Sequence, residues 1–197
     1  MTPGRLLGGL LVLALLGGCV QQPRQAPADW QTHLNAVSAQ TRWDLQGKIG
    51  LRAPGRAGSA FLSWNQTPEN YRLVLSGALG LGRLVLDGDA SGVTWQDKDG
   101  ATRHHPDPSV LIAKAWGWTV PVNALRYWVR GIPDPSLPVD DQVLEHGLST
   151  RFRQSGWTVA PENYSDVGGI SLPGRVRLNG ETAAITVSIS RWTLPPA

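Results

Sequence analysis

The fold is decided by residues 43–51, WDLQGKIGL. From the first tryptophan onward, every second residue is apolar or glycine, and the residues between them are Asp, Gln, Lys and Gly. A period of two places the apolar side chains on one face of a β-strand, so this stretch predicts a half-buried strand. Residues 184–192 near the C-terminus have the same pattern, with Ile185, Val187 and Ile189 on one face.

Short strands of this kind recur along most of the chain. Turns rich in Gly, Asn, Asp and Pro separate them, at a spacing of about 8–12 residues. The further strands predicted in this way cover residues 59–65, 71–75, 83–86, 93–96, 151–154, 156–160 and 174–178. This organisation predicts an antiparallel meander that curls into a barrel or a sandwich.

Three short helices interrupt the strand pattern. Asp29 is a suitable N-cap for a helix over residues 29–41, which has one apolar stripe. Asp107-Pro108 predicts the start of a second helix that ends at Gly117, and residues 123–130 predict a third. The last two helices lie within a β-rich sequence, so we expect them to pack on its apolar face. Residues 133–147 are rich in Pro and Asp and predict a loop.

The N-terminus predicts export and lipidation. Arg5 precedes an uncharged apolar run over residues 6–16, which is too short to span a bilayer, and residues 16–19 read LGGC. This arrangement resembles the lipobox of bacterial lipoproteins, which implies acyl chains on Cys19. Residues 1–18 are then a signal peptide, 19–28 the lipidated N-terminus and tether, and 29–197 a single domain.

An ordinary signal peptide with an incidental cysteine is the alternative to the lipobox. Cys19 is the only cysteine of the chain, so an internal disulfide is impossible, and an unpaired thiol would be a liability in the oxidising periplasm. Val20 stands where lipoproteins of the inner membrane usually carry Asp, which favours sorting to the outer membrane.

Several other classes of function find little support in the sequence. The formal net charge is only +3 and no run of Lys or Arg occurs, which argues against nucleic acid. His104 and His105 are adjacent, so in a strand their rings point to opposite faces and cannot bind one metal ion. No nucleophile elbow, phosphate-binding loop or zinc-protease motif is present. We therefore expect no enzyme activity, metal or cofactor, although a scattered Ser/His/Asp triad remains possible.

Seven segments, taken together and in order, resemble the LolB family of outer-membrane lipoproteins. Each segment is a weak signal alone, but their joint order is fairly specific. They cover residues 43–50, 64–66, 71–80, 117–122, 127–133, 156–159 and 190–192. One departure is Ala78, where many members of the family have proline.

This resemblance implies an unclosed antiparallel β-barrel, mainly β with short helices that form a lid over an apolar cavity for acyl chains. It implies an outer-membrane receptor that accepts lipoproteins from a periplasmic carrier of the same fold and inserts them into the inner leaflet. The carrier of this fold has no lipid anchor, so Cys19 favours the receptor. We expect a monomer whose partners are the carrier, the acyl chains and the membrane.

Two sets of apolar residues are candidates for this function. Leu79 and Leu81 lie in a glycine-rich loop between two predicted strands. From the residues alone the loop is either an exposed tip or part of the core, and the resemblance favours a tip that enters the membrane. The residues that are candidates for lining the acyl-chain cavity are Trp64, Leu75, Trp116, Trp118 and Trp128. The alternative is that they are ordinary residues of a packed core.

Two other functions remain as alternatives. The first is a structural lipoprotein that binds a protein or a cell-wall glycan through the outside of the barrel. The second is a periplasmic hydrolase, which would require a Ser/His/Asp cluster in a cleft.

Overall fold

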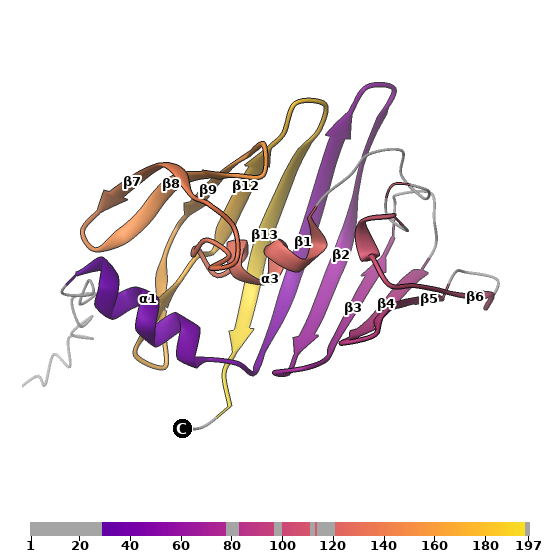
Figure 1. The fold of residues 1–197 in the computed structure, drawn as a ribbon, viewed down its shortest axis with the longest axis horizontal. Helices are drawn as coiled ribbons and strands as arrows, with labels where there is room; N and C mark the ends of the chain where they lie inside the picture. Colours follow the sequence, from indigo (N-terminus) through magenta and orange to yellow (C-terminus); the bar gives the residue numbers. More distant parts are fainter. Residues whose placement is uncertain (1–28, 78–82, 97–99, 111–112, 114–120, 196–197) are drawn as a thin grey trace, which may run out of the picture.

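One antiparallel sheet of eleven strands forms the body of the molecule (Figure 1). The structure is a computed structural model, which describes residues 29–77, 83–96, 100–110, 113 and 121–195. The strands are ordered β6-β5-β4-β3-β2-β1-β13-β12-β9-β8-β7. Their bounds are β1 Trp43–Ala53, β2 Arg56–Gln66, β3 Tyr71–Ser76, β4 Arg83–Asp89, β5 Gly92–Gln96, β6 Thr102–His105, β7 Asp140–Glu145, β8 Leu148–Gln154, β9 Trp157–Glu162, β12 Arg175–Asn179 and β13 Ala184–Thr193.

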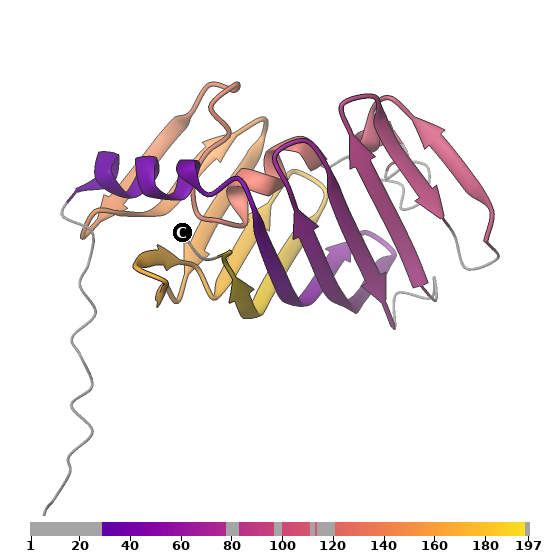
Figure 2. The same ribbon diagram turned by 90° about the horizontal axis from the view of Figure 1, so that it is seen from below.

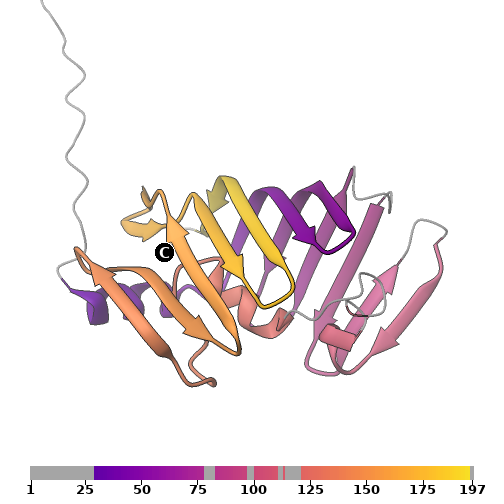
Figure 3. The same cartoon turned by 90° about the horizontal axis from the view of Figure 1, so that it is seen from above.

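The sheet curves into a trough that does not close (Figures 2 and 3). Its two edge strands, β6 and β7, lie on opposite sides of the molecule and have no pairing with each other. The predicted fold class, a mainly β chain with short helices and an unclosed antiparallel barrel, is therefore confirmed. The open side is the one that carries the helices, and we call the face of the sheet beneath them the inner face.

Alternation along the strands decides which side chains cover the inner face. In β2, Leu62 and Trp64 are buried while Phe61, Ser63 and Asn65 between them are exposed. The main core consists of such inward residues from nearly every strand, together with residues of the helix that lies across them. The period of two in the sequence therefore corresponds directly to burial on one face.

A β-bulge shapes the centre of the sheet, where β1 pairs with β13. The register shifts between Gln46 and Gly47. A Cβ atom at residue 47 would overlap the backbone carbonyl oxygen of Ser188 on the neighbouring strand. Only glycine permits this close approach of the two backbones.

Two helices have described bounds, α1 (Trp30–Ala39) and α3 (Val122–Trp128). The Asp29 side chain caps α1 by accepting a hydrogen bond of 2.7 Å from the backbone N–H of Thr32, as the sequence predicts. α3 lies across the inner face of the sheet (Figures 1 and 2) and buries Val122, Ala124 and Trp128 in the main core. Residues 108–110 are helical at the predicted start of the second helix, most of which lies outside the described residues.

A smaller core joins α1 to the opposite end of the chain. Val37 of α1 packs with Ile132 and Leu172, and Trp192 near the C-terminus lies against the same cluster. Leu172 belongs to a two-stranded ribbon of β10 (Ser165–Val167) and β11 (Ile170–Leu172). This packing holds α1 against one side of the sheet, next to the start of β1.

The prediction of a loop over residues 133–147 is wrong for its second half, because β7 occupies Asp140–Glu145. β7 is an edge strand with irregular register against β8, and its side chains are exposed or half-buried on both faces. Such a strand has no apolar face, so hydrophobic alternation could not reveal it. The short ribbon of β10 and β11 was missed for a similar reason, since three-residue strands carry too little periodicity.

Candidate functional site

The inner face brings together those predicted cavity residues that the structure describes. Trp64 in β2, Leu75 in β3 and Trp128 in α3 are all buried in the same core cluster. Trp116 and Trp118, together with Cys19, Leu79 and Leu81, lie outside the described residues. The inner face is thus a continuous apolar surface, and its use as an acyl-chain cavity stays a prediction.

Aromatic rings form a row at one end of the inner face. The ring of Trp43 lies 5.3 Å from that of Trp64 and 5.5 Å from that of Trp192, and Trp64 lies 6.2 Å from Tyr71. These contacts join β13, β1, β2 and β3 across the sheet. Trp43 begins the apolar face of the strand predicted over residues 43–51, whereas no pattern in the sequence singles out Tyr71.

Trp128 fixes the C-terminal end of α3 to strand β8. Its indole Nε1–H donates to the Gln154 side-chain oxygen at 2.8 Å, and the same oxygen accepts from the backbone N–H of Asp134 at 2.9 Å. The Gln154 amide nitrogen donates to the backbone carbonyls of Asp134 and Leu137. A buried polar network with every member paired holds one conformation. Trp128 is therefore an anchor of α3 as well as a core residue.

The N-terminal end of α3 has no side-chain cap. Pro121 precedes the helix and provides no side-chain hydrogen bond to its first N–H groups. The helix spans only seven residues, so its stability depends on packing against the sheet. α3 is therefore held on the sheet by the packing of Val122, Ala124 and Trp128 in the main core, and at its C-terminal end also by the hydrogen bonds to Gln154.

Three buried donor atoms on or beside the inner face have no hydrogen-bond partner within the described chain. They are Tyr71 Oη, Trp95 Nε1 and Arg126 Nε. Burial raises the pKa of Tyr71 to about 12, so its hydroxyl remains a neutral donor at ordinary pH. A buried polar group without a partner costs about 1–3 kcal/mol. Tyr71 and Trp95 are therefore places where an acceptor on a molecule bound to the inner face would be stabilised, whereas Arg126 lines a separate pocket.

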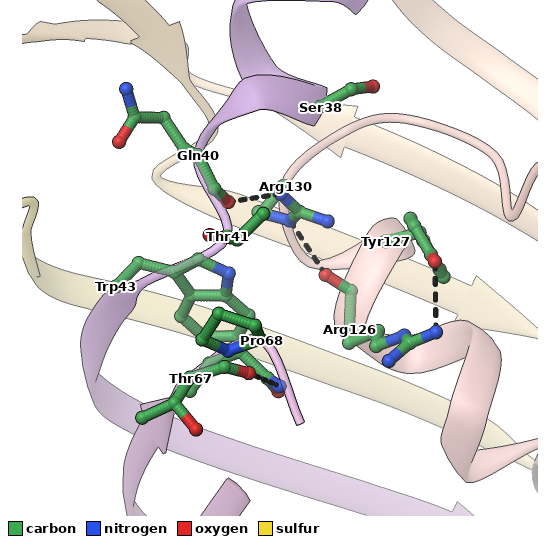
Figure 4. A pocket seen from close by; sticks show the side chains of 10 residues that line it. Ser38, Gln40, Thr41, Trp43, Thr67, Pro68, Arg126, Tyr127 and Arg130 are labelled. Atoms are coloured by element: carbon green, nitrogen blue, oxygen red, sulfur yellow. Dashed lines mark hydrogen bonds between the residues drawn. The ribbon is translucent and has the colours of Figure 1, made fainter. Parts of the chain in front are cut away.

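A pocket of about 170 Å³ lies beside α3, at the end of the sheet where β1 begins and β2 ends (Figure 4). α1, the turn from β2 to β3, and α3 all contribute to its wall. The lining residues are Ser38, Gln40, Thr41, Trp43, Gln66, Thr67, Pro68, Arg126, Tyr127 and Arg130. No sequence pattern predicts this pocket, because its residues come from three separate segments.

Arg130 is the most constrained cation of this pocket and only 6% exposed. Its Nε–H donates to the backbone carbonyl of Arg126 at 2.8 Å. Its Nη1 donates to the carbonyls of Val37 and Gln40, at 2.9 and 3.0 Å. Burial lowers its pKa to about 10, while nearby Tyr127 raises it and Arg126 lowers it. The guanidinium therefore remains protonated at neutral pH and ties α1 to α3.

Phe61 in β2 is an aromatic side chain of the outer face that is 61% exposed. The Lys48 ammonium lies 5.0 Å from the centre of its ring. Phe61 pairs with Ser76, the last residue of β3, and lies beside Gly77, where the chain leaves β3. An apolar ring with a cation beside it therefore adjoins the end of β3 from which the predicted membrane loop departs.

The adjacent residues His104 and His105 contact different groups. His104 Nδ1 lies 3.4 Å from the Thr94 hydroxyl, whereas His105 Nδ1 contacts the backbone of Asp107. Among the described residues, no group of three or more His, Cys, Asp or Glu side chains is placed to hold a metal ion. Nor does any helix in the described ranges have the length and apolar character needed to cross a membrane.

Comparisons with known proteins agree with this architecture. The family model described as "Outer membrane lipoprotein LolB" matches residues 41–192. The outer-membrane lipoprotein LolB of Cellvibrio japonicus is 37% identical over 194 residues, which cover 96% of each chain. The outer-membrane lipoprotein LolB of Alkalilimnicola ehrlichii is 36% identical over 200 residues, which cover 100% of each chain. Among solved structures, a LolA superfamily protein from Nitrosomonas europaea has a TM-score of 0.58 at 8% identity, covering 87% of this chain and 96% of that chain.

Proposed function

Because the chain belongs to the LolB family of outer-membrane lipoproteins, we propose that it is the receptor that takes other lipoproteins from a periplasmic carrier and inserts them into the outer membrane. The resemblance found in the sequence is confirmed by this membership. In the proposal, acyl chains on Cys19 hold the protein in the membrane, and the carrier has the same fold. The bound lipoprotein is recognised through its acyl chains and released into the inner leaflet.

The observation that carries this proposal is the apolar inner face of an open sheet, covered by the short helix α3. Burial of an acyl chain releases about 0.8 kcal/mol for each CH₂ group. A lipoprotein therefore cannot cross the periplasm with its chains in water, and each transfer has to pass from one apolar surface to another. An open trough provides such a surface, and displacement of α3, which covers it, would give access to it.

The experiment that tests the proposal uses the chain from Val20 onward, produced without lipid, and a carrier loaded with one lipoprotein. After mixing, the two proteins are separated by affinity purification, and the lipoprotein is followed. We expect it to move to this chain, because a receptor must bind acyl chains more tightly than the carrier does. If it stays on a carrier that is shown to be active, reception is refuted and a scaffolding lipoprotein becomes the working model.

Adjacent residues of β3 provide a matched pair of variants for this test. Leu75 points to the inner face, and Val74 is its neighbour on the other face. Leu75→Gln should reduce transfer strongly, whereas Val74→Gln should leave it close to the original level. Circular dichroism and thermal melting of both variants show whether the fold is intact. Equal transfer by two folded variants would argue against the inner face as the acyl-chain site.

A further inference from the structure

The pocket beside α3 has two positive charges and no negative charge in its lining. Arg126 and Arg130 both contribute to its wall, and none of the other eight lining residues is acidic. Neither arginine forms an ion pair with a residue in the described ranges; the ion pairs seen there, such as Arg72 with Asp87, lie on the exposed surface. Buried charges in proteins are normally paired, so an uncompensated pair of cations requires an explanation.

Contacts of the Arg130 guanidinium offset part of the cost of burying its charge. Three of its N–H groups are satisfied by backbone carbonyls, two of them at the C-terminal end of α1, where the helix dipole is negative. Its planar group lies between two aromatic rings, 5.7 Å from the centre of Trp43 and 5.4 Å from that of Tyr127. The remaining nitrogen, Nη2, donates to no described residue. The side chain is thus held rigidly, with one edge free.

Arg126 adds a second cation that is also only partly satisfied. Its Nη2 donates to the Tyr127 hydroxyl at 2.9 Å, and its guanidinium lies 4.7 Å from the centre of the Tyr127 ring. Its Nε is buried and has no partner among the described atoms. Figure 4 shows both arginines among the side chains that line the same pocket. The two arginines therefore present unused donors from one short segment.

We propose that this pocket binds a phosphate-type oxyanion between Arg126 and Arg130. A doubly charged tetrahedral anion would neutralise the two cations and accept several hydrogen bonds at once, which neutral ligands cannot do. Ser38 and Thr41 lie at the exposed rim and bring hydroxyl donors to the same opening. The pocket volume of about 170 Å³ accommodates one such group. The anion is either free phosphate or the phosphate of a lipid headgroup.

This pocket is separate from the loop that is proposed to insert lipoproteins into the membrane. The pocket lies where β3 begins, and the predicted membrane loop leaves β3 at its other end (Figure 1). A variant that loses the anion should consequently still accept and insert lipoproteins. Failure of one proposal can therefore be distinguished from failure of the other.

The test measures binding to the lipid-free chain by isothermal titration calorimetry at constant ionic strength. The probes are sodium phosphate, sodium acetate and a soluble short-chain phosphatidylglycerol below its micelle concentration. Arg126→Gln removes one cation of the pocket, and Arg42→Gln removes the same charge from an exposed neighbouring residue that does not line it. We expect Arg126→Gln to weaken phosphate binding by about tenfold or more and Arg42→Gln to change it little.

Each outcome bears directly on the proposal. Binding of both phosphate and the phospholipid, lost in Arg126→Gln, supports a headgroup site, and binding of phosphate alone supports a site for the free anion. Absence of phosphate binding overturns the proposal, as does equal binding by the two variants or binding of acetate as tight as that of phosphate. Because Arg130 also holds α1, Arg130→Lys serves as a second variant that keeps the charge. It should retain the fold and weaken phosphate binding through loss of the planar donor edge.

Discussion

At the scale of single residues, His33 is the side chain whose burial has the clearest consequence. It lies in α1, nearly inaccessible to solvent, between the rings of Trp30 and Tyr164 at 5.7 and 6.2 Å. Its Nε2 has no hydrogen-bond partner in the part of the chain that the structure describes. Burial lowers the pKa of His33 from 6.5 to about 4, so the folded protein holds the neutral ring.

This shift predicts a loss of stability at mildly acidic pH. Between pH 6.5 and about 4 the unfolded chain binds a proton at His33 and the folded chain does not, so stability falls as the pH is lowered through this window. Above pH 6.5 the contribution is fully present. Thermal melting should show a midpoint that decreases by about 2–4 °C for each kcal/mol lost.

A variant of the same residue separates this effect from general acid denaturation. His33→Phe keeps an aromatic ring between Trp30 and Tyr164 but cannot be protonated, so it should have a flatter pH dependence. His104→Gln, which changes an exposed histidine of β6, should retain the slope of the original chain. An unchanged slope in His33→Phe would show that another group is responsible.

At the scale of elements, the bulge between β1 and β13 predicts that two glycines of β1 differ in how well they tolerate substitution by alanine. Gly47→Ala would drive a Cβ atom into the backbone carbonyl of Ser188, which no side-chain movement can relieve. A Cβ at Gly50 would meet the carbonyl of Thr186 at 3.9 Å, an ordinary contact. We therefore expect Gly47→Ala to cost about 1–3 kcal/mol and Gly50→Ala to cost much less.

Urea denaturation of the two alanine variants measures this difference. Both changes add one methyl group to the same strand, so the effect of strand propensity is common to both. Equal midpoints would mean that the bulge is not retained in solution.

The same elements show how much of the fold the sequence could predict. Strands with one buried face, such as β1, β2 and β13, were predicted within a few residues, because burial on one face imposes a period of two. The edge strand β7 has no such face and was mistaken for a loop. The family resemblance added the open barrel, which local patterns could not distinguish from a sandwich.

The candidate site was less predictable than the fold. Trp64, Leu75 and Trp128 lie in one core cluster, because each belongs to an apolar strand face or to a helix that must pack, and their role as acyl-chain cavity residues stays a prediction. The arginine pocket depends on Arg130 reaching the end of α1, which is about ninety residues earlier in the chain. An arginine near a helix end has no periodic signal, so only the folded structure reveals that contact.

At the scale of the whole molecule, acceptance and insertion are assigned to different ends and faces of the sheet. The inner face is proposed to take the acyl chains, while the loop with Leu79 and Leu81 is proposed to enter the membrane. Phe61 and Lys48 lie on the outer face next to the end of β3. An aromatic ring and a cation are suited to the interface between lipid headgroups and acyl chains, which supports contact of this end with the membrane.

This separation predicts that the two steps can be lost independently. Leu79→Glu should still accept a lipoprotein from the carrier but fail to release it into phospholipid vesicles, because a carboxylate is costly in the bilayer. Phe61→Ser should weaken vesicle binding by a smaller amount without affecting acceptance. Leu75→Gln should fail at the earlier step. A flotation assay with vesicles measures insertion, and co-purification measures acceptance. Normal insertion by Leu79→Glu would remove the loop from the mechanism, because the inner face alone would then account for both steps.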